Sequence, residues 1–325
     1  MTYEDPLAYA IGLEGLALLR SFTGGRDRAF TEARLAEIRE LLDDASLAGA
    51  AVDVVDVGTV DGYEIWSRTY DGPNSAFDFD EPVIGEILGG LPAGDALDAA
   101  CGTGRTAALL APRGHRVVGV DSSPDMLARA RERVPGGDFR PGTLQELPVA
   151  DDSVDLVVCS LALTHVRELP PVMEEFARVL RPGGHLVISD MHHEWVGRGM
   201  VPPVRLPDGT RGRLQSYRHP TGDYLRAALP VGLQVRRCEE PLNRTAEDSE
   251  NSSARNASKS RNASKSRNSS RSQNSSQSQN SSRRREPGPW ELWPWCLADL
   301  VPEAAEAANE AVPVEVIWHF QLAGT

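Results

Sequence analysis

The sequence predicts an α/β fold in which helices wrap a mostly parallel sheet. Three observations support this prediction: short apolar runs alternate with segments of helical pattern, one buried run ends in glycines, and an acid closes the next run. Residues 123–125 supply a helix start with a cap, a proline and a first-turn acid, and residues 181–184 end a helix before a strand. Strands are expected over residues 96–101, 116–121, 137–141, 154–160, 185–190, 233–239 and 314–322.

Residues 1–75 read as a helical and hairpin extension in front of that sheet. Apolar residues recur at helical spacing over 5–45, where a glycine pair at 24–25 divides two helices. Residues 52–70 alternate like two strands joined by a turn at 61–62. We expect the extension to cover the active-site edge of the sheet. The alternative is a dimerisation or packing element, so a homodimer stays open.

The glycine-rich loop after the first strand predicts a nucleotide site. The run over 96–105 ends in Gly102 and Gly104, which lack the Cβ that would keep a ligand away from the backbone. The helix that follows offers backbone N–H groups to an anionic group. Asp121 lies 17 residues beyond Gly104, where an acid at the end of the second strand accepts both ribose hydroxyls. Gly102-x-Gly104-x-x-Ala107 also fits the looser dinucleotide fingerprint, so a nicotinamide cofactor is an alternative.

The composition divides the rest of the chain into three parts. Residues 76–243 are expected to form the cofactor-binding core, and 287–325 its last helix and strand. Between them, residues 244–286 form an insert in which a six-residue Asn/Ser/Arg pattern repeats over 256–280. These repeats contain no large apolar residue, so they cannot bury a core and are expected to be disordered. We favour a repeat expansion in a tolerant loop over a basic tether for acidic partners.

Charge and cysteine usage exclude several classes of protein. The net charge is −13, but residues 251–285 hold nine Arg or Lys and no acid, so the remainder carries 25 positive against 47 negative charges, or −22. The negative charge of the chain outside residues 251–285 is expected to repel the phosphate backbone of nucleic acid. The four cysteines lack disulfide or metal spacing, there is no apolar run of 18 residues, and the N-terminus carries no export signal. A cytoplasmic protein with no membrane partner is therefore expected.

Several motifs between residues 66 and 191 occur in the order found in a known family. They are Asp98-x-Ala100-x-Gly102-x-Gly104 and the runs at 120–127, 142–148, 155–161 and 176–184. In this order they resemble the class I S-adenosylmethionine (SAM)-dependent methyltransferases of the methyltransferase type 11, UbiE-like group. The resemblance implies a Rossmann-like class I methyltransferase fold, with a seven-stranded, mostly parallel sheet whose last strand is antiparallel.

The same resemblance implies how the cofactor SAM is held. Asp98 organises its methionine end, and Tyr70 matches the tyrosine that closes over that end, with a packed aromatic as the alternative. From its place after the loop, Arg105 either reaches the SAM carboxylate or starts a helix in solvent. Asp121 binds the ribose and Met126 packs on the adenine. Alanine replaces the usual first glycine, and threonine stands where the family often has an aspartate in the adenine loop. The residues expected to bind the cofactor are Tyr70, Asp98, Ala100, Cys101, Gly102, Gly104, Arg105, Asp121, Ser122, Met126, Thr143, Leu144 and Ser160.

Histidines near the ends of the fourth and fifth strands are the candidate catalytic residues. A hydroxyl or protonated amine acceptor needs a base within hydrogen-bond reach, whereas a carbon or neutral amine needs none. His165 follows the fourth strand, where it serves either as a base or as scaffold, and His192 and His193 follow the fifth. Neighbouring residues of an extended chain point in opposite directions, so at most one of that pair faces substrate. No metal site is expected, because no ligand pair at helical spacing or carboxylate cluster accompanies these histidines.

The leading hypothesis is a SAM-dependent methyltransferase that modifies a small-molecule acceptor at oxygen or nitrogen by direct displacement. A nucleic-acid methyltransferase is disfavoured, because the chain lacks a Pro-Pro-aromatic signature after the fourth strand and its body is acidic. Two alternatives stay open. One is a SAM-binding regulator without catalysis, and the other is an NAD-dependent oxidoreductase, for which no separate catalytic region is evident.

Overall fold

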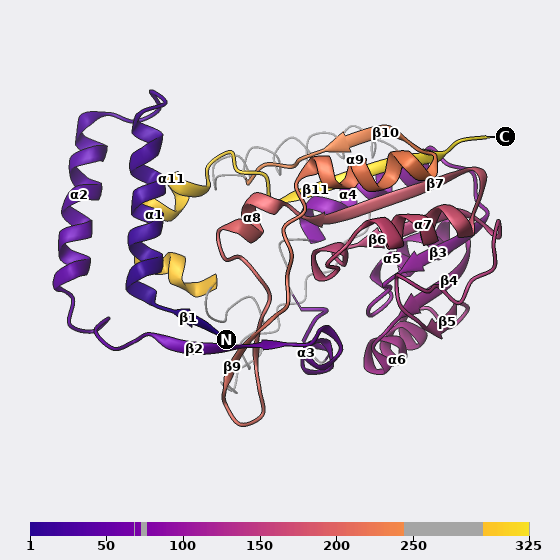
Figure 1. Cartoon of the computed structure of the whole chain (residues 1–325), viewed down its shortest axis with the longest axis horizontal. Coiled ribbons are helices and arrows are strands. Elements are labelled where there is room, and N and C mark those ends of the chain that lie inside the picture. The colour runs from indigo at the N-terminus through magenta and orange to yellow at the C-terminus, as the bar shows by residue number, and fades with distance from the viewer. Residues whose placement is uncertain (68, 73–76, 244–294, 325) are drawn as a thin grey trace, which may run out of the picture.

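The computed structural model describes residues 1–325 except 68, 73–76, 244–294 and 325, and a seven-stranded sheet dominates it (Figure 1). The strand order is β10-β11-β7-β6-β3-β4-β5, and β11 runs antiparallel to both of its neighbours. The predicted seven strands and the antiparallel last strand are therefore confirmed. The strands are β3 (Asp95–Ala99), β4 (Arg116–Asp121), β5 (Asp138–Pro141), β6 (Val154–Ser160), β7 (Leu180–Met191), β10 (Leu233–Glu239) and β11 (Glu315–Leu322).

Helices cover both faces of this sheet. On one face lie α4 (Phe77–Gly89), α5 (Arg105–Leu110) and α6 (Pro124–Arg133), whose apolar side chains bury the outer side of β3 and β4. On the other lie α7 (Pro170–Val179) and α9 (Thr221–Ala228). The chain winds from β3 to β5 in one direction and returns to β6 on the other side of β3. This reversal opens a crevice at the carboxyl ends of β3 and β6, where open α/β sheets bind ligands.

A second sheet, of four strands, joins the N-terminal extension to residues near 210. Its order is β1-β2-β9-β8, with a parallel pairing of β2 and β9. The sequence showed no sign of this pairing, because its two strands are separated by about half of the chain. A turn at residues 206–210 joins β8 to β9 as an antiparallel hairpin. The strands are β1 (Thr2–Glu4), β2 (Val52–Val57), β8 (Pro203–Arg205) and β9 (Arg211–Leu214).

The hairpin predicted over residues 52–70 is wrong in its second half. The first strand is present as β2, but the next segment is a helix, α3 (Thr59–Trp66). The Asp61-Gly62 pair lies inside this helix instead of at a turn. A Cβ built on Gly62 would meet the Leu214 side chain at 1.9 Å, so the glycine permits close packing of α3 on β9. Trp66, buried against Val204 and Leu214, anchors the helix.

The N-terminal helices form an arm beside the main sheet (Figure 1). The helical prediction over residues 5–45 is confirmed by α1 (Pro6–Ser21) and α2 (Arg28–Asp43). A helix near the C-terminus, α11 (Pro302–Asn309), buries its alanines against α1. Residues 287–325 are expected to supply the last helix and strand of the core, and within the described part of this range β11 joins the seven-stranded sheet. The remaining short helices are η1 (Ala111–Arg113), η2 (Leu163–His165), α8 (His193–Gly197), η3 (Leu229–Val231) and η5 (Trp295–Leu300).

Two further expectations concern the insert at 244–286 and helices that could span a membrane. The predicted disorder of the insert at 244–286 falls on residues outside the described part of the chain. In the described ranges, no helix combines the length and the apolarity that crossing a bilayer would require.

Candidate functional site

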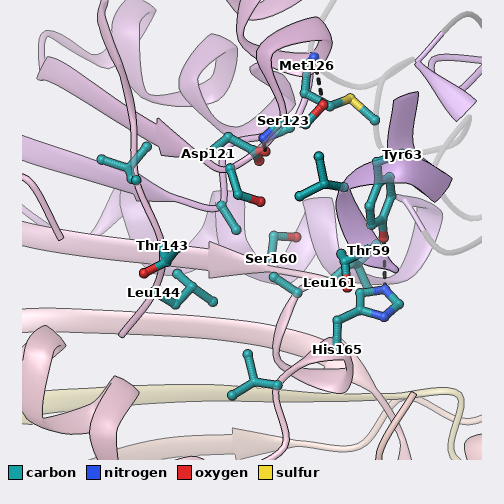
Figure 2. Close-up of a pocket in the computed structure, with 18 of the residues that line it drawn as sticks. Thr59, Tyr63, Asp121, Ser123, Met126, Thr143, Leu144, Ser160, Leu161 and His165 are labelled. Carbon is teal, nitrogen blue, oxygen red and sulfur yellow. Dashed lines mark hydrogen bonds between the residues drawn. The ribbon is translucent and has the colours of Figure 1, made fainter. Parts of the chain in front are cut away.

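A pocket opens at the carboxyl ends of β3, β4 and β6, at the reversal of strand order (Figure 2). The loops after these strands form its floor, and residues of α3 and the turn after it form one wall. The extension therefore covers the predicted edge of the sheet. Of the residues expected to bind a cofactor, those that line the pocket are Tyr70, Ala100, Gly102, Asp121, Ser122, Met126, Thr143, Leu144 and Ser160.

Asp121 is fixed at the end of β4 by two backbone donors. Its Oδ2 accepts a hydrogen bond from the Gly102 N–H and its Oδ1 one from the Ser123 N–H, both at 2.8 Å. Each carboxylate oxygen can accept a second bond, so the group can still bind two hydroxyls in the pocket. Burial raises the pKa of Asp121, and the backbone donors oppose that shift.

The loop after β3 holds a backbone conformation that favours glycine. Ala100 has φ of 57° and Gly102 has φ of 51°, both in the left-handed region. Leu161, which follows the neighbouring strand β6, has φ of 54° and also lines the pocket. Nothing lies within 4 Å of a Cβ built on Gly102, so the space beside it is open to a ligand. Strained loop residues at two adjacent strand ends are typical of functional sites.

Asp98 and Gly104 fix how this loop leads into α5. Asp98 is almost completely buried, and its Oδ2 accepts a hydrogen bond from the Ala107 N–H at 2.8 Å, at the start of α5. Burial raises the pKa of Asp98 to about 7. Gly104, with φ of 79°, lets α5 approach α6, because a Cβ there would lie 3.1 Å from the Ala130 Cα. Neither residue lines the pocket directly.

Cys101 points away from the pocket. Its side chain is buried among apolar residues of α4, α5 and α6 on the opposite side of the loop. Burial raises the pKa of its thiol far above the ordinary value. Cys101 is not among the described residues that line the pocket, and its cofactor contact stays a prediction.

Arg105 is held by protein carboxylates instead of projecting into the pocket. Its two Nη atoms bind both oxygens of Asp80 at 2.7 and 2.8 Å, and Nη2 also donates to Ser160 Oγ at 2.6 Å. The guanidinium lies over the Phe77 ring, 4.2 Å from its centroid. Because Asp80 is completely buried, this pair is an anchor between α4 and α5. Arg105 is not among the described residues that line the pocket, and its contact with a cofactor carboxylate stays a prediction.

His165 lies in the pocket and both of its ring nitrogens are engaged. Nδ1 is 2.8 Å from the Gln215 carbonyl oxygen, and Nε2 is 2.9 Å from the Tyr63 hydroxyl (Figure 2). Since a carbonyl can only accept, Nδ1 carries the proton, and Nε2 of the neutral ring accepts from Tyr63. Burial lowers the pKa of His165, which favours this neutral form.

The structure does not bring the other two candidate histidines to the pocket. His192 caps α8 through Nδ1, and its Nε2 lies 3.4 Å from a Glu240 carboxylate oxygen. The His193 ring lies against His192 with centroids 4.4 Å apart, and its Nδ1 has no hydrogen-bond partner among the described residues. Both rings lie at the carboxyl end of β7, where Met191 pairs with the first residue of β11. Among the residues with described positions, no cluster of His, Cys, Asp or Glu is suited to a metal ion.

Two residues that shape the site were not predicted from the sequence. Tyr63 was assigned to a strand and was given no role, yet it lines the pocket and contacts Tyr70 edge to face. Asp80 was not singled out, although it binds Arg105 and receives a hydrogen bond from Ser160 at 2.6 Å. The short run over 59–66 gave no sequence signal that separates a helix from a strand, so nothing pointed to the first. An acid at the start of an apolar helix was the available signal for the second.

Known proteins resemble the part of the chain that builds this pocket. A family model described as "Methyltransferase domain" matches residues 97–188. A demethylmenaquinone methyltransferase of Renibacterium salmoninarum is 36% identical over 115 residues, which cover 35% of this chain and 48% of that protein. A malonyl-[acyl-carrier protein] O-methyltransferase of Serratia marcescens is 35% identical over 112 residues, covering 33% and 44%. A solved S-adenosylmethionine dependent methyltransferase from Mesorhizobium loti has a TM-score of 0.43, 20% identity, and coverage of 73% and 96%.

The fold and site define a Rossmann-like α/β protein with a pocket at the carboxyl edge of its sheet. Residues 97–188 match a methyltransferase domain, and this part of the chain is similar to known methyltransferases. The matched segments span less than half the length of the two curated relatives.

Proposed function

We infer that this protein transfers a methyl group from SAM to a small-molecule acceptor, at oxygen or nitrogen. The observation that carries the proposal is the Asp121 carboxylate, which is held by the Gly102 and Ser123 amides at the rim of a pocket and keeps acceptor capacity for two hydroxyls. The methyltransferase domain at 97–188 supports the same reading.

The residues present fit the cofactor. Gly102 leaves open space beside the first loop, Asp121 offers acceptors suited to a ribose, and the apolar Met126 and Leu144 side chains offer contacts to an adenine. SAM supplies an electrophilic methyl on a sulfonium, so the chain's task is to orient the acceptor and exclude water. Tyr63 and Tyr70 provide the cover, since both line the pocket from the extension.

His165 has a positioning role in this proposal. Its Nε2 lone pair is bonded to the Tyr63 hydroxyl, so it is not available to an acceptor in this arrangement. The ring instead links α3 to the segment at Gln215 and fixes the wall of the pocket. A base at this point would require Tyr63 to move first. The arrangement favours acceptors whose nucleophilic atom does not depend on His165 for deprotonation.

Calorimetry on the full chain tests the cofactor assignment. SAM and its demethylated product, S-adenosylhomocysteine, should bind, whereas NAD should not. Asp121→Ala should weaken binding by about 2–3 kcal/mol, the magnitude of a lost pair of charge-assisted hydrogen bonds. Asp125→Ala is the matched control, because Asp125 is exposed on the same side of the sheet, at the start of α6. Binding of NAD in place of SAM would favour the oxidoreductase.

Catalysis needs a separate readout, because a regulator would also bind SAM. The full chain is incubated with methyl-labelled SAM and a small-metabolite extract, and labelled products are counted. Uptake that disappears in Asp121→Ala supports the enzyme. Tight SAM binding with no uptake into metabolites, nucleic acid or protein would favour the regulator.

A further inference from the structure

Part of the pocket lining has no role in holding the cofactor in the proposed function. Its side chains come from the start of α3 and from the turn after β6, and they are Thr59, Val60, Leu161, Ala162, His165 and Val166. Figure 2 shows Leu161 and His165 near the Tyr63 ring. Leu144, which is assigned to the adenine, lies on the opposite side of Ser160 in this view. We call these six residues the acceptor wall.

The acceptor wall carries no ionised side chain. Four of its six residues are valine, leucine or alanine, Thr59 is uncharged, and His165 is a neutral ring. Among the described residues that line the whole pocket, Asp121 is the one carboxylate, and none is Lys or Arg. Because Asp121 is assigned to the ribose, a charged acceptor would lose its hydration here without meeting an opposite charge. That loss costs several kcal/mol.

The acceptor wall also offers no free group that can take a proton. Both ring nitrogens of His165 are occupied, by the Gln215 carbonyl and the Tyr63 hydroxyl. Burial raises the pKa of Tyr63 well above its ordinary value and that of Tyr70 to about 12, so both phenols stay protonated near neutral pH. An acceptor that must first lose a proton, such as an alcohol or a protonated amine, therefore finds no base among the described residues of this wall.

A neutral nitrogen on an aromatic ring meets both conditions. An aliphatic amine is charged at neutral pH, as lysine is with its pKa of about 10.4, whereas an amine attached directly to an aromatic ring is not. Its lone pair forms the bond to the methyl carbon while the methyl–sulfur bond breaks and leaves its electron pair on sulfur. The positive charge passes from sulfur to nitrogen, and the methylated nitrogen then releases its proton to water. The Tyr63 and Tyr70 rings beside the wall suit a planar ligand and a transient positive charge.

We propose that the acceptor is an uncharged aromatic amine, which lies against the acceptor wall and is methylated at nitrogen. Val60 and Leu161 are then specificity-determining residues, because their apolar side chains line the pocket from α3 and from the end of β6. This proposal rests on the proposed methyltransferase function and narrows its acceptor class.

The test measures transfer from methyl-labelled SAM by the full chain, with two series of probes that share a ring and differ in one group. The first series is aniline, phenol, benzoate and benzylamine, and the second is the four naphthyl equivalents. At least one arylamine should be methylated at nitrogen, with kcat/KM at least about tenfold above that of every other probe in its series. Its rate should be constant between about pH 6 and 8, because no proton has to be removed before the transfer.

Val60→Asp places a carboxylate in the acceptor wall. It should reduce the preference for the arylamine over the alkyl amine of the same series by about tenfold or more, and leave the affinity for S-adenosylhomocysteine unchanged. Val235→Asp is the matched control. Val60 and Val235 are similarly exposed, at 41% and 38%, but Val235 lies on β10 and does not line the pocket. The control should keep the preference of the wild type.

Several results overturn the proposal. These are equal or faster methylation of the phenol, the acid or the alkyl amine, no transfer to either arylamine, or an unchanged preference in Val60→Asp. A rate that rises through about pH 6.5, the ordinary pKa of histidine, also overturns it, because a base would then take part. Any of these results with intact S-adenosylhomocysteine binding refutes the acceptor class alone. Failure of S-adenosylhomocysteine itself to bind refutes the methyltransferase function.

Discussion

The Tyr63 hydroxyl lies 2.9 Å from Nε2 of His165 and ties the N-terminal extension to the carboxyl edge of the sheet. The two rings meet edge to face, with centroids 5.5 Å apart. Because Nδ1 faces the Gln215 carbonyl, the same ring also fixes the segment after β9. One neutral histidine therefore joins three parts of the chain around the pocket.

Tyr63→Phe removes the donor and leaves Nε2 of His165 unpaired in a buried place. We expect the free energy of unfolding to fall by about 1–2 kcal/mol, as for other buried groups that lose a partner. The affinity for S-adenosylhomocysteine should change little, because the aromatic ring remains. Urea denaturation with calorimetry measures both. Tyr3→Phe, at an exposed position, is the control, and an equal loss of stability there would contradict the argument.

The Ala100→Gly substitution should raise the free energy of unfolding, whereas Tyr63→Phe should lower it. A left-handed conformation costs an alanine about 1–2 kcal/mol, while the extra chain entropy of glycine costs about 0.5–1 kcal/mol. With φ of 57° at this position, Ala100→Gly should therefore stabilise the fold by about 0.5–1 kcal/mol. Ala99→Gly, one residue earlier in the buried strand β3, should destabilise it by at least about 1 kcal/mol. Chemical denaturation of both variants checks the pair, and a stabilised Ala99→Gly would show that φ is not the cause.

Residues of the site that lie close together in sequence could be predicted. Gly102 and Asp121 belong to one strand–helix–strand unit, whose local pattern fixes how its loops meet. Seven strands and their order of appearance followed from the alternation of apolar runs with helical segments. Such signals depend on neighbours within about 20–30 residues of one another.

Contacts between distant parts of the chain could not be predicted. Tyr63 and His165 are 102 residues apart, and Ser160 and Asp80 are 80 apart. Arg105 illustrates the consequence. Its position after the glycine-rich loop suggested a contact with a ligand, but in the structure it pairs with the buried Asp80 carboxylate of α4. The apolar residues of α3 are compatible with a strand or a helix over so short a run, and packing on β9 decided between them.

Asp98 makes the stability of the fold depend on pH. Its pKa is raised from 3.8 to about 7, because burial penalises the charged form. Between these values the folded chain holds a proton that the unfolded chain lacks, so this group lowers stability as the pH rises, and the loss is complete above about 7.

Asp98→Asn removes this dependence and keeps an oxygen for the Ala107 N–H. The variant should match the wild type near pH 4 and be more stable near pH 8. Urea denaturation of both proteins across this range gives the difference. A constant difference at every pH would mean that Asp98 has the same pKa in both states.

Removing residues 246–285 tests whether the basic repeat contributes to the cofactor site. The described residues on either side already hold the two last strands together. The Asn243 N–H donates to the Val312 carbonyl at 2.9 Å, Leu242 bridges to Pro313, and the ladder of β10 and β11 continues from there. The described residues that line the pocket all lie before 167.

We therefore expect the deletion to leave the melting temperature and the affinity for S-adenosylhomocysteine unchanged. The shorter loop changes the entropic free energy of loop closure by only about 1 kcal/mol, because this cost varies with the logarithm of loop length. Thermal unfolding and calorimetry of the shortened chain provide the measurement. A control that removes residues 302–309 instead should unfold at lower temperature, because α11 buries its alanines against α1. A large loss of cofactor affinity in the repeat deletion would show that the insert acts on the site.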